Sequence, residues 1–256
     1  MRPSPALSGK RVVITRPGAQ ADNLARLVRE AGGEPLCIPA IEILPLADPA
    51  PFQALAKRLA AFDLAIFVSR NAVRSALELL GNQPWPAGLK VATVGQGSKE
   101  ELEKRGHAGV IAPAAQSDSE ALLVMPELAE VRGRRIVIFR GDGGRKLLGD
   151  TLTGRGAIVE YAACYRRARP EAGAVLREAW AGGVDAVTVS SAEGLANFLQ
   201  MLGEQRAKRV EEIPLFVPHP RVAQDAARRG LKRVIVAGPR DAEMLAALAA
   251  HFRGAG

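Results

Sequence analysis

Residues 10–16 read KRVVITR, and residues 134–140 read RRIVIFR, which is nearly the same sequence 124 positions further along the chain. In both copies an apolar, β-branched run is followed by a glycine-containing turn and then by apolar residues at helical spacing. In the first copy these residues are Leu24, Leu27, Val28 and Ala31. A strand that feeds a helix through a short loop is half of a βαβ unit. The repeat therefore predicts two similar α/β halves.

Three further pairs of segments repeat at nearly the same offset. They are DLAIFVSRNAVRSAL (63–77) with DAVTVSSAEGLANFL (185–199), VATVGQGSKEELEKRG (91–106) with LFVPHPRVAQDAARRG (215–230) and, more loosely, GVIAPAAQSDSEALL (109–123) with RVIVAGPRDAEMLAAL (233–248). Eight alternating strand–helix units favour parallel sheets that are covered by helices on both faces. We therefore expect a pair of flavodoxin-like, doubly wound domains.

Two long extended stretches complicate the division into domains. GEPLCIPAIEILP (33–45) and AIVEYAACYRRARP (157–170) are rich in strand-forming residues, and neither feeds a helix promptly. Together they predict an antiparallel, two-stranded connection between domains. The pattern alone also permits a simple cut near residue 130, so both divisions stay open at this point.

Composition limits the class of protein. The chain has 48% apolar and 24% charged residues, which is typical of a globular protein with a real core, and no apolar run is long enough to cross a membrane. The N-terminus lacks the apolar run of a signal peptide, and the two cysteines, Cys37 and Cys164, are predicted to be free thiols, so we expect a cytoplasmic protein.

The net charge of +8 suits an acidic partner, which includes nucleic acid, a membrane surface and a small polyanion, but a merely solvated surface explains it equally well. Aromatic residues make up only 4% of the chain, which disfavours a stacking platform for single-stranded nucleic acid.

Small hydroxyl residues occupy the turns after several predicted strands. The simplest interpretation is helix capping, and Ser98 with Glu101 and Ser190 with Glu193 match the S-x-x-E capping box. The same turns lie at the carboxyl ends of strands, where helix N-termini attract anionic ligands. Serine, glycine and arginine side chains there suit carboxylates or phosphates.

Standard cofactor motifs are absent. G-x-G-x-x-G is only half present at Gly95 and Gly97, and Gly141 with Gly143 is a second partial match. His107, His219 and His251 lie far apart in the sequence, so no metal site is predicted, and no Ser/His/Asp set can be singled out.

The only tyrosines, Tyr161 and Tyr165, both fall in the stretch 157–170. Their even spacing predicts that they face the same side of a strand. Two interpretations stay open for Tyr165: ordinary strand packing, or a weak acid, followed by Arg166 and Arg167, that lines a cleft between domains beside anionic groups.

Taken together, these segments resemble the uroporphyrinogen-III synthase family along essentially the whole chain. The resemblance is carried by VVITRPGAQADNL with IPAIEI, FVSRNAV, VATVGQGSKEEL, GAIVEYAACYRR, VSSAEGLANFL and LFVPHPRVAQDAARRG, in this order and spacing. It implies two α/β domains joined by two strands, the second domain being inserted in the first. The implied boundaries are 1–36 plus 171–256 for domain 1, 44–157 for domain 2, and 37–43 and 158–170 for the linking strands.

The resemblance also implies an activity: closure of the linear tetrapyrrole hydroxymethylbilane with inversion of ring D and loss of water, without cofactor or metal. The substrate carries eight carboxylates, which fits the positive charge of the chain. Carried over by position, Tyr165 is the candidate acid. The implied substrate-binding residues are Arg16, Ser69, Arg70, Gly95, Ser98, Arg140, Ser190, Ser191, His219 and Arg221. The family often has a hydroxyl in the turn at 219–222, where this chain has Pro220 and Arg221.

Two other classes of protein compete with this interpretation. One is a two-lobed protein that binds a small anion without catalysis, and the other is a nucleic-acid-associated module supported by charge alone. The resemblance further implies a monomer that binds neither nucleic acid nor membrane and that contacts hydroxymethylbilane synthase transiently.

Overall fold

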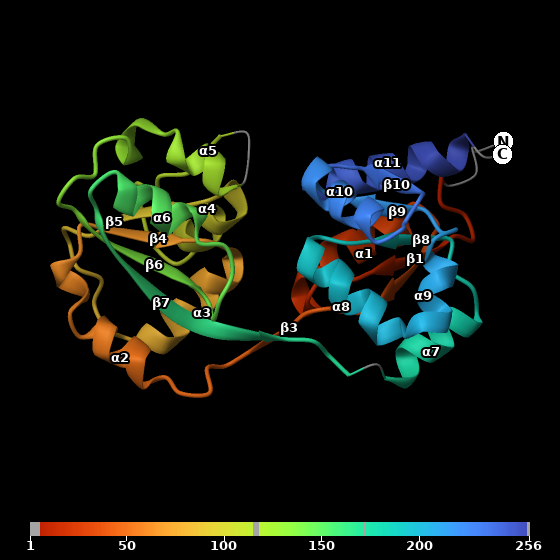
Figure 1. Cartoon of the computed structure of the whole chain (residues 1–256), viewed down its shortest axis with the longest axis horizontal. Coiled ribbons are helices and arrows are strands. Elements are labelled where there is room, and N and C mark those ends of the chain that lie inside the picture. Colours follow the sequence, from red (N-terminus) through yellow and green to blue (C-terminus); the bar gives the residue numbers. More distant parts are fainter. Residues whose placement is uncertain (1–5, 115–117, 172, 255–256) are drawn as a thin grey trace. The chain divides into compact units, whose positions relative to one another are not determined.

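The computed structural model describes residues 6–114, 118–171 and 173–254. The chain divides into two compact units, each with its own sheet (Figure 1). Unit 1 comprises Met1–Glu42 and Ala168–Gly256, and unit 2 comprises Ile43–Arg167. Residues 37–42 thus fall in unit 1 and residues 158–167 in unit 2, and the two-stranded connection expected of these segments stays a prediction.

Unit 1 contains a five-stranded sheet of order β10-β9-β8-β1-β2 in which every strand pair is parallel. Its strands are β1 (Arg11–Ile14), β2 (Glu34–Cys37), β8 (Ala186–Thr188), β9 (Leu215–Val217) and β10 (Val234–Val236). Its helices are η1 (Gly18–Gln20), α1 (Asp22–Glu30), α7 (Ala174–Ala181), α8 (Ala192–Leu202), α9 (Glu204–Val210), α10 (Pro220–Arg228) and α11 (Asp241–Arg253).

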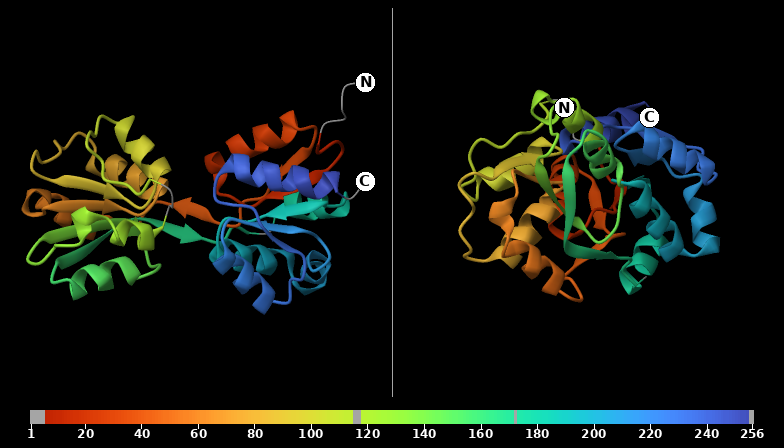
Figure 2. Two further views of the ribbon diagram at one scale, coloured as in Figure 1. Left: turned by 90° about the horizontal axis from the view of Figure 1, so that it is seen from above. Right: turned by 60° about the vertical axis from the view of Figure 1, so that its left-hand side comes forward.

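Alternation along the buried strands sends side chains to both faces of this sheet. In β1, Val13 joins the core formed with α7, α8 and α10, whereas Val12 and Ile14 join the core formed with α1 and α11. The two helix layers are visible on opposite sides of the sheet in Figure 2. Burial on both faces explains why the strands are almost continuously apolar.

Unit 2 contains a five-stranded sheet of order β3-β7-β6-β4-β5, and the β4–β5, β4–β6 and β6–β7 pairs are parallel. Its strands are β3 (Glu42–Leu44), β4 (Leu64–Phe67), β5 (Lys90–Thr93), β6 (Arg135–Gly141) and β7 (Ile158–Ala168). Its helices are α2 (Ala50–Ala56), η2 (Leu59–Ala61), α3 (Arg70–Leu80), α4 (Gln96–Glu103), α5 (Ser119–Leu123), η3 (Pro126–Leu128) and α6 (Leu147–Gly154).

Here too each face has its own core. Phe67, Val137 and Phe139 pack with α2, α3 and α4 on one face, while Ile66 and Ile138 pack with α5 and α6 on the other. The fold is therefore α/β with two parallel-dominated sheets, as the repeat predicts.

The internal repeat corresponds to the same spatial order in both sheets. The order β9-β8-β1-β2 of unit 1 has its counterpart in β5-β4-β6-β7 of unit 2. The weakest repeat departs from this rule. Residues 233–248 contribute to β10 and α11. In the described parts of 109–123, 109–114 and 118–123, Ile111 forms an isolated bridge with Ala92, and α5 follows. Pro113, two residues beyond the bridge, limits further pairing there because proline has no N–H to donate.

Within residues 6–114, 118–171 and 173–254, no helix combines the length and the apolarity that a membrane crossing requires.

Both cysteines are free, and their surroundings differ. Cys37 is exposed at the end of β2. Cys164 is buried in β7, where its thiol donates to the carbonyl of Arg140 at 3.2 Å, and burial raises the pKa of this thiol to about 12.

We therefore expect native protein at pH 8 to react with one equivalent of an aromatic disulfide reagent, and denatured protein without reductant to react with two. The reason is that the nucleophile is the thiolate, which Cys164 does not form near neutral pH. Cys37→Ser is the matched control and should abolish the native reaction. Rapid reaction of that variant in its folded state would contradict the prediction.

Candidate functional site

The carboxyl ends of neighbouring strands carry the predicted site residues in both units. In unit 2 they follow β4 and β5 or lie in the carboxyl-terminal parts of β6 and β7, and these four strands are adjacent in the sheet. This unit 2 set consists of Ser69, Arg70, Gly95, Ser98, Arg140 and Tyr165. In unit 1 they follow β1, β8 and β9, which are also adjacent. This unit 1 set consists of Arg16, Ser190, Ser191, His219 and Arg221.

Tyr165 is the centre of the unit 2 set. Its side chain is 1% exposed and belongs to the core beneath α3. Its hydroxyl lies 3.3 Å from Oγ of Ser69 and accepts a hydrogen bond from Nη2 of Arg167 at 3.4 Å. Its ring packs on the backbone of Gly141, where an added Cβ would lie 2.8 Å from Cε2 of the ring. The phenol is thus held on one side by a hydroxyl, on another by a guanidinium and below by a glycine.

The prediction that Tyr161 and Tyr165 face the same side is wrong. Tyr161 is 41% exposed, and its ring lies 4.9 Å from the guanidinium carbon of Arg140. The register between β6 and β7 shifts at Arg140–Gly141, so that Cys164 is skipped and Tyr165 pairs with Gly141. One extra residue in a strand moves every following side chain to the opposite face of the sheet. The bulge therefore places the Tyr165 side chain in the core on the α3 face.

Ser69 has two partners. It is the N-cap of α3, and its Oγ accepts from the backbone N–H of Ala72 at 3.1 Å, which confirms the capping interpretation at this turn. The same oxygen contacts the hydroxyl of Tyr165. A hydroxyl oxygen carries one proton and two lone pairs, so cap and contact are compatible.

The two predicted capping boxes are wrong. Gly95 is the N-cap of α4, so Ser98 lies inside the first turn, where it is buried, and Glu101 pairs with Arg74 instead. In unit 1, Ser191 caps α8 by accepting from the N–H of Gly194 at 3.0 Å, while Ser190 is exposed in the preceding turn. The S-x-x-E pattern cannot tell which of several adjacent small residues is the cap.

Arg70 is the first residue of α3, and its guanidinium lies on Gly97 in the first turn of α4. A cation near two helix N-termini is electrostatically unfavourable, because each N-terminus carries a partial positive charge. This placement becomes favourable when an anion joins the group. The arrangement is therefore suited to a carboxylate ligand.

Arg140 and Arg16 are held by their own units. Arg140, in β6, donates to the carbonyl of Gly143. Arg16, after β1, forms an ion pair with Asp241 at the start of α11, and Asp241 also accepts from Asn23. Both guanidinium groups lie at strand ends, but each is already engaged by a neighbouring loop or helix.

His219 and Arg221 begin α10. His219 occupies the N-cap position without a side-chain cap bond, Pro220 takes the first helical position, and Arg221 is exposed beside it. Proline is favoured there because its missing N–H would be unpaired in any case. The turn thus presents an imidazole and a guanidinium at a helix N-terminus.

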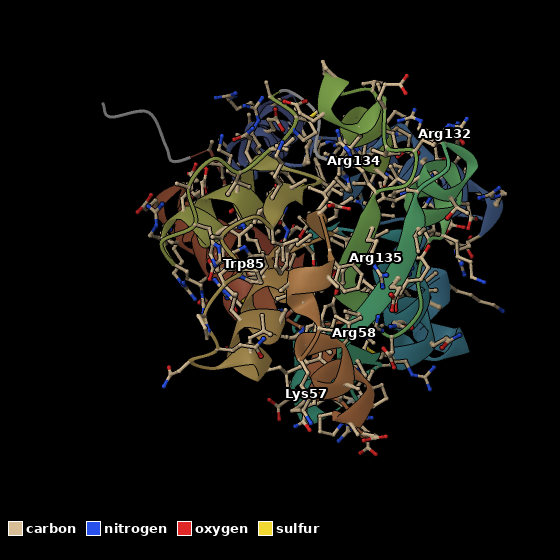
Figure 3. All side chains as sticks on the ribbon, turned by 90° about the vertical axis from the view of Figure 1, so that its left-hand side faces the viewer. Lys57, Arg58, Trp85, Arg132, Arg134 and Arg135 are labelled. Carbon is tan, nitrogen blue, oxygen red and sulfur yellow. The ribbon has the colours of Figure 1, made fainter. Side chains whose placement is uncertain are left out.

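A second group of arginines lies at the amino ends of the unit 2 strands, where Arg58 and Arg135 are labelled in Figure 3. Both guanidinium carbons lie near the ring of Phe62, at 5.8 and 5.7 Å. Both also pair with Glu160, whose bond to Arg58 is the main cause that holds the pKa of this carboxyl below its usual range. Both guanidinium groups share one carboxylate within unit 2, at the opposite ends of the strands from the predicted site residues, so we assign this group to structure.

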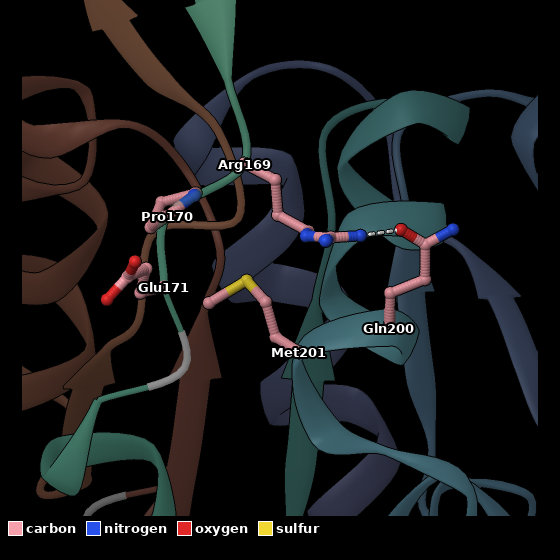
Figure 4. Close-up of a pocket in the computed structure, with 5 residues that line it drawn as sticks. All are labelled: Arg169, Pro170, Glu171, Gln200 and Met201. Atoms are coloured by element: carbon pink, nitrogen blue, oxygen red, sulfur yellow. Dashed lines mark hydrogen bonds between the residues drawn. The ribbon is translucent and has the colours of Figure 1, made fainter.

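A pocket of about 270 Å³ in unit 1 is lined by Arg169, Pro170, Glu171, Gln200 and Met201 (Figure 4). Arg169 hydrogen bonds to the amide oxygen of Gln200 across it. None of the predicted site residues lines this pocket. Over the part of the chain that the structure describes, no group of three or more His, Cys, Asp or Glu side chains is placed to hold a metal ion.

Three residues that shape the unit 2 set were visible in the sequence but were not predicted as site residues: Arg167, Gly97 and Gly141. Arg167 lies two residues after Tyr165, and this even spacing puts both side chains on one face of β7, where the guanidinium donates to the phenol oxygen. The two glycines belong to the partial phosphate-binding motifs, and these motifs were the only sequence signal that pointed to them.

Comparison with known proteins agrees with the geometry. Residues 22–247 match the family model described as uroporphyrinogen-III synthase HemD. Uroporphyrinogen-III synthases of Salmonella typhimurium and Escherichia coli are each 32% identical to this chain over 242 residues, covering 91% of it and 97% of the relative.

A crystal structure of a mutant uroporphyrinogen III synthase from the extremely thermophilic bacterium Thermus thermophilus covers 96% of this chain and 100% of its own, with a TM-score of 0.65 and 20% identity. At that identity the likeness supports the fold alone. The family model and the near-complete alignments to the two bacterial relatives establish that the chain belongs to the uroporphyrinogen-III synthase family.

Proposed function

We propose that this chain is a lyase that cyclises hydroxymethylbilane to uroporphyrinogen III, with inversion of ring D and loss of water. The observation that carries the proposal is the buried hydroxyl of Tyr165, held 3.3 Å from Ser69 at the carboxyl ends of the unit 2 strands, in a chain of this family. A two-lobed anion-binding protein gains no support from the comparisons.

The proposed chemistry needs one proton and much positioning. The C–O bond of the hydroxymethyl group breaks, and its oxygen leaves as water with a proton that Tyr165 supplies directly or through Ser69. The resulting azafulvene is attacked by ring D through its substituted carbon, which gives a spiro intermediate that rearranges to the inverted ring. Loss of a proton from the rearranged ring restores the pyrrole and returns a proton to the phenolate of Tyr165. Acid catalysis of this kind contributes about 10²–10⁴-fold. Holding the flexible chain in the reactive geometry supplies the rest.

The eight carboxylates of the substrate are the proposed ligands of both strand-end sets. In unit 2, Arg70 and Ser98 adjoin the N-terminus of α4, with Arg140 at the end of β6. In unit 1, Ser190 and Ser191 precede α8, and His219 and Arg221 begin α10. Arg16 and Gly95 complete the two sets. Support comes from the positive charge of helix N-termini and from the cation placed against them at Arg70.

We also propose that each unit is a flavodoxin-like domain and that 37–43 and 158–170 form a two-stranded connection, which the pairing of β3 with β7 supports. Two free thiols support a reducing, cytoplasmic setting. We further propose a monomer that receives its substrate during transient contact with hydroxymethylbilane synthase. Analytical sedimentation of the protein at micromolar concentration tests whether it is monomeric.

The decisive experiment supplies purified protein with hydroxymethylbilane generated in situ, oxidises the products and separates the porphyrin isomers by chromatography. We expect mainly isomer III. The bilane also closes unaided to the uninverted isomer I. Isomer I alone, formed at the uncatalysed rate, would refute the proposal.

Arg221 gives a prediction specific to this chain. Arg221→Ala should raise the apparent KM by at least about tenfold with little change in kcat, because a charge-assisted hydrogen bond to a carboxylate is worth roughly 1.5–3 kcal/mol. Arg228→Ala, at the other end of α10 and 75% exposed, is the matched control and should leave KM unchanged. An unchanged KM in Arg221→Ala would remove this residue from the site.

A further inference from the structure

Gly97 belongs to a partial G-x-G-x-x-G motif, which is too incomplete to predict a nucleotide site. The structure gives it another role. Gly97 lies in the first turn of α4, and the guanidinium of Arg70, which comes from the start of α3, lies on it. A Cβ at this position would lie 2.6 Å from Cζ of Arg70 and closer still to two of its nitrogens.

The backbone does not require glycine here. Gly97 is absent from the glycines that have positive φ, so an L-residue fits its conformation. Inside a helix, alanine is intrinsically more stable than glycine. The missing side chain therefore has no local conformational purpose. The absence of a side chain at Gly97 leaves the space that the guanidinium of Arg70 occupies.

That space decides where the charge of Arg70 is held. Arg70 is an exposed residue and the N-terminus of α4 repels a cation, so a side chain at position 97 would make the guanidinium move away from this helix. We propose that Gly97 is a positioning residue, which holds Arg70 at the N-terminus of α4 so that its guanidinium and the free N–H groups bind one substrate carboxylate. This inference rests on the proposed function.

The test is a double-mutant cycle on the full chain. Gly97→Ala and Arg70→Ala should each raise KM for hydroxymethylbilane about tenfold, the factor expected for one charge-assisted contact, with kcat changed less than about threefold. Because Gly97 acts through Arg70, the double variant should be no worse than Arg70→Ala. The melting temperature of Gly97→Ala should not fall, since alanine favours the helix.

Gly88→Ala is the matched control, because nothing lies within 4 Å of its Cβ position and its φ is not positive. It should retain the KM of the parent protein. Additive effects in the double variant, or a normal KM in Gly97→Ala, would overturn the inference.

A crystal structure of Gly97→Ala separates this inference from the proposed function. We expect the guanidinium of Arg70 to leave the first turn of α4. If it stays in place, the inference fails whatever the activity. If it moves but the parent protein makes no isomer III, the positioning role in catalysis fails together with the proposed function, and the steric contact alone remains.

Discussion

Replacing Tyr165 by phenylalanine should lower kcat about 10²–10⁴-fold, the usual contribution of a positioned acid. KM should change little, because the side chains proposed to bind carboxylates are untouched. The fold should persist, since the ring that packs on Gly141 is retained and Ser69 keeps its cap on α3. The measurement is the initial rate of isomer III formation with substrate generated in situ.

Tyr161→Phe is the matched control for this variant. Tyr161 is 41% exposed, and its hydroxyl donates to the carbonyl of Lys146 at 3.4 Å, away from Ser69. It should keep nearly full activity. If Tyr165→Phe retained more than about a tenth of the parent kcat, acid catalysis by Tyr165 would be excluded.

Phe139→Ala should lower the free energy of unfolding of unit 2 by about 3–5 kcal/mol. Phe139 is 0% exposed in β6, the middle strand of its sheet, and stacks on Phe67 with ring centroids 4.7 Å apart. Its removal leaves a cavity that rigid strands on both sides cannot close. Unit 1 should be unaffected, because each core cluster draws its residues from one unit only.

The two tryptophans allow this to be measured unit by unit. Trp85 lies against the unit 2 core and Trp180 is buried in unit 1. Urea unfolding followed by fluorescence, in backgrounds that keep one tryptophan each, should show Phe139→Ala shifting the Trp85 transition alone. Phe216→Ala, in the second core of unit 1, should shift only the Trp180 transition. Equal shifts of both transitions would contradict independent cores.

Local pattern determined the elements of this protein and their order. A β-branched run, a glycine turn and helix-spaced leucines specify strand, loop and helix within about twenty residues, so the repeat predicted two α/β halves with parallel sheets. The strand order that the two sheets share was seen only in the structure. The succession of the same segments also identified the family. Where proline removed a donor, at Pro113, the repeat overestimated a strand.

Tertiary structure alone decided how the site residues are held. The facing of Tyr165 depends on a bulge between β6 and β7, which no periodicity within one strand records. Arg16 finds Asp241 at the opposite end of the chain, and Arg70 is seated on Gly97 from a different helix. Side-chain partners are set by strand register and helix packing between distant segments, whereas sequence periodicity reports only which face of its own element a residue occupies.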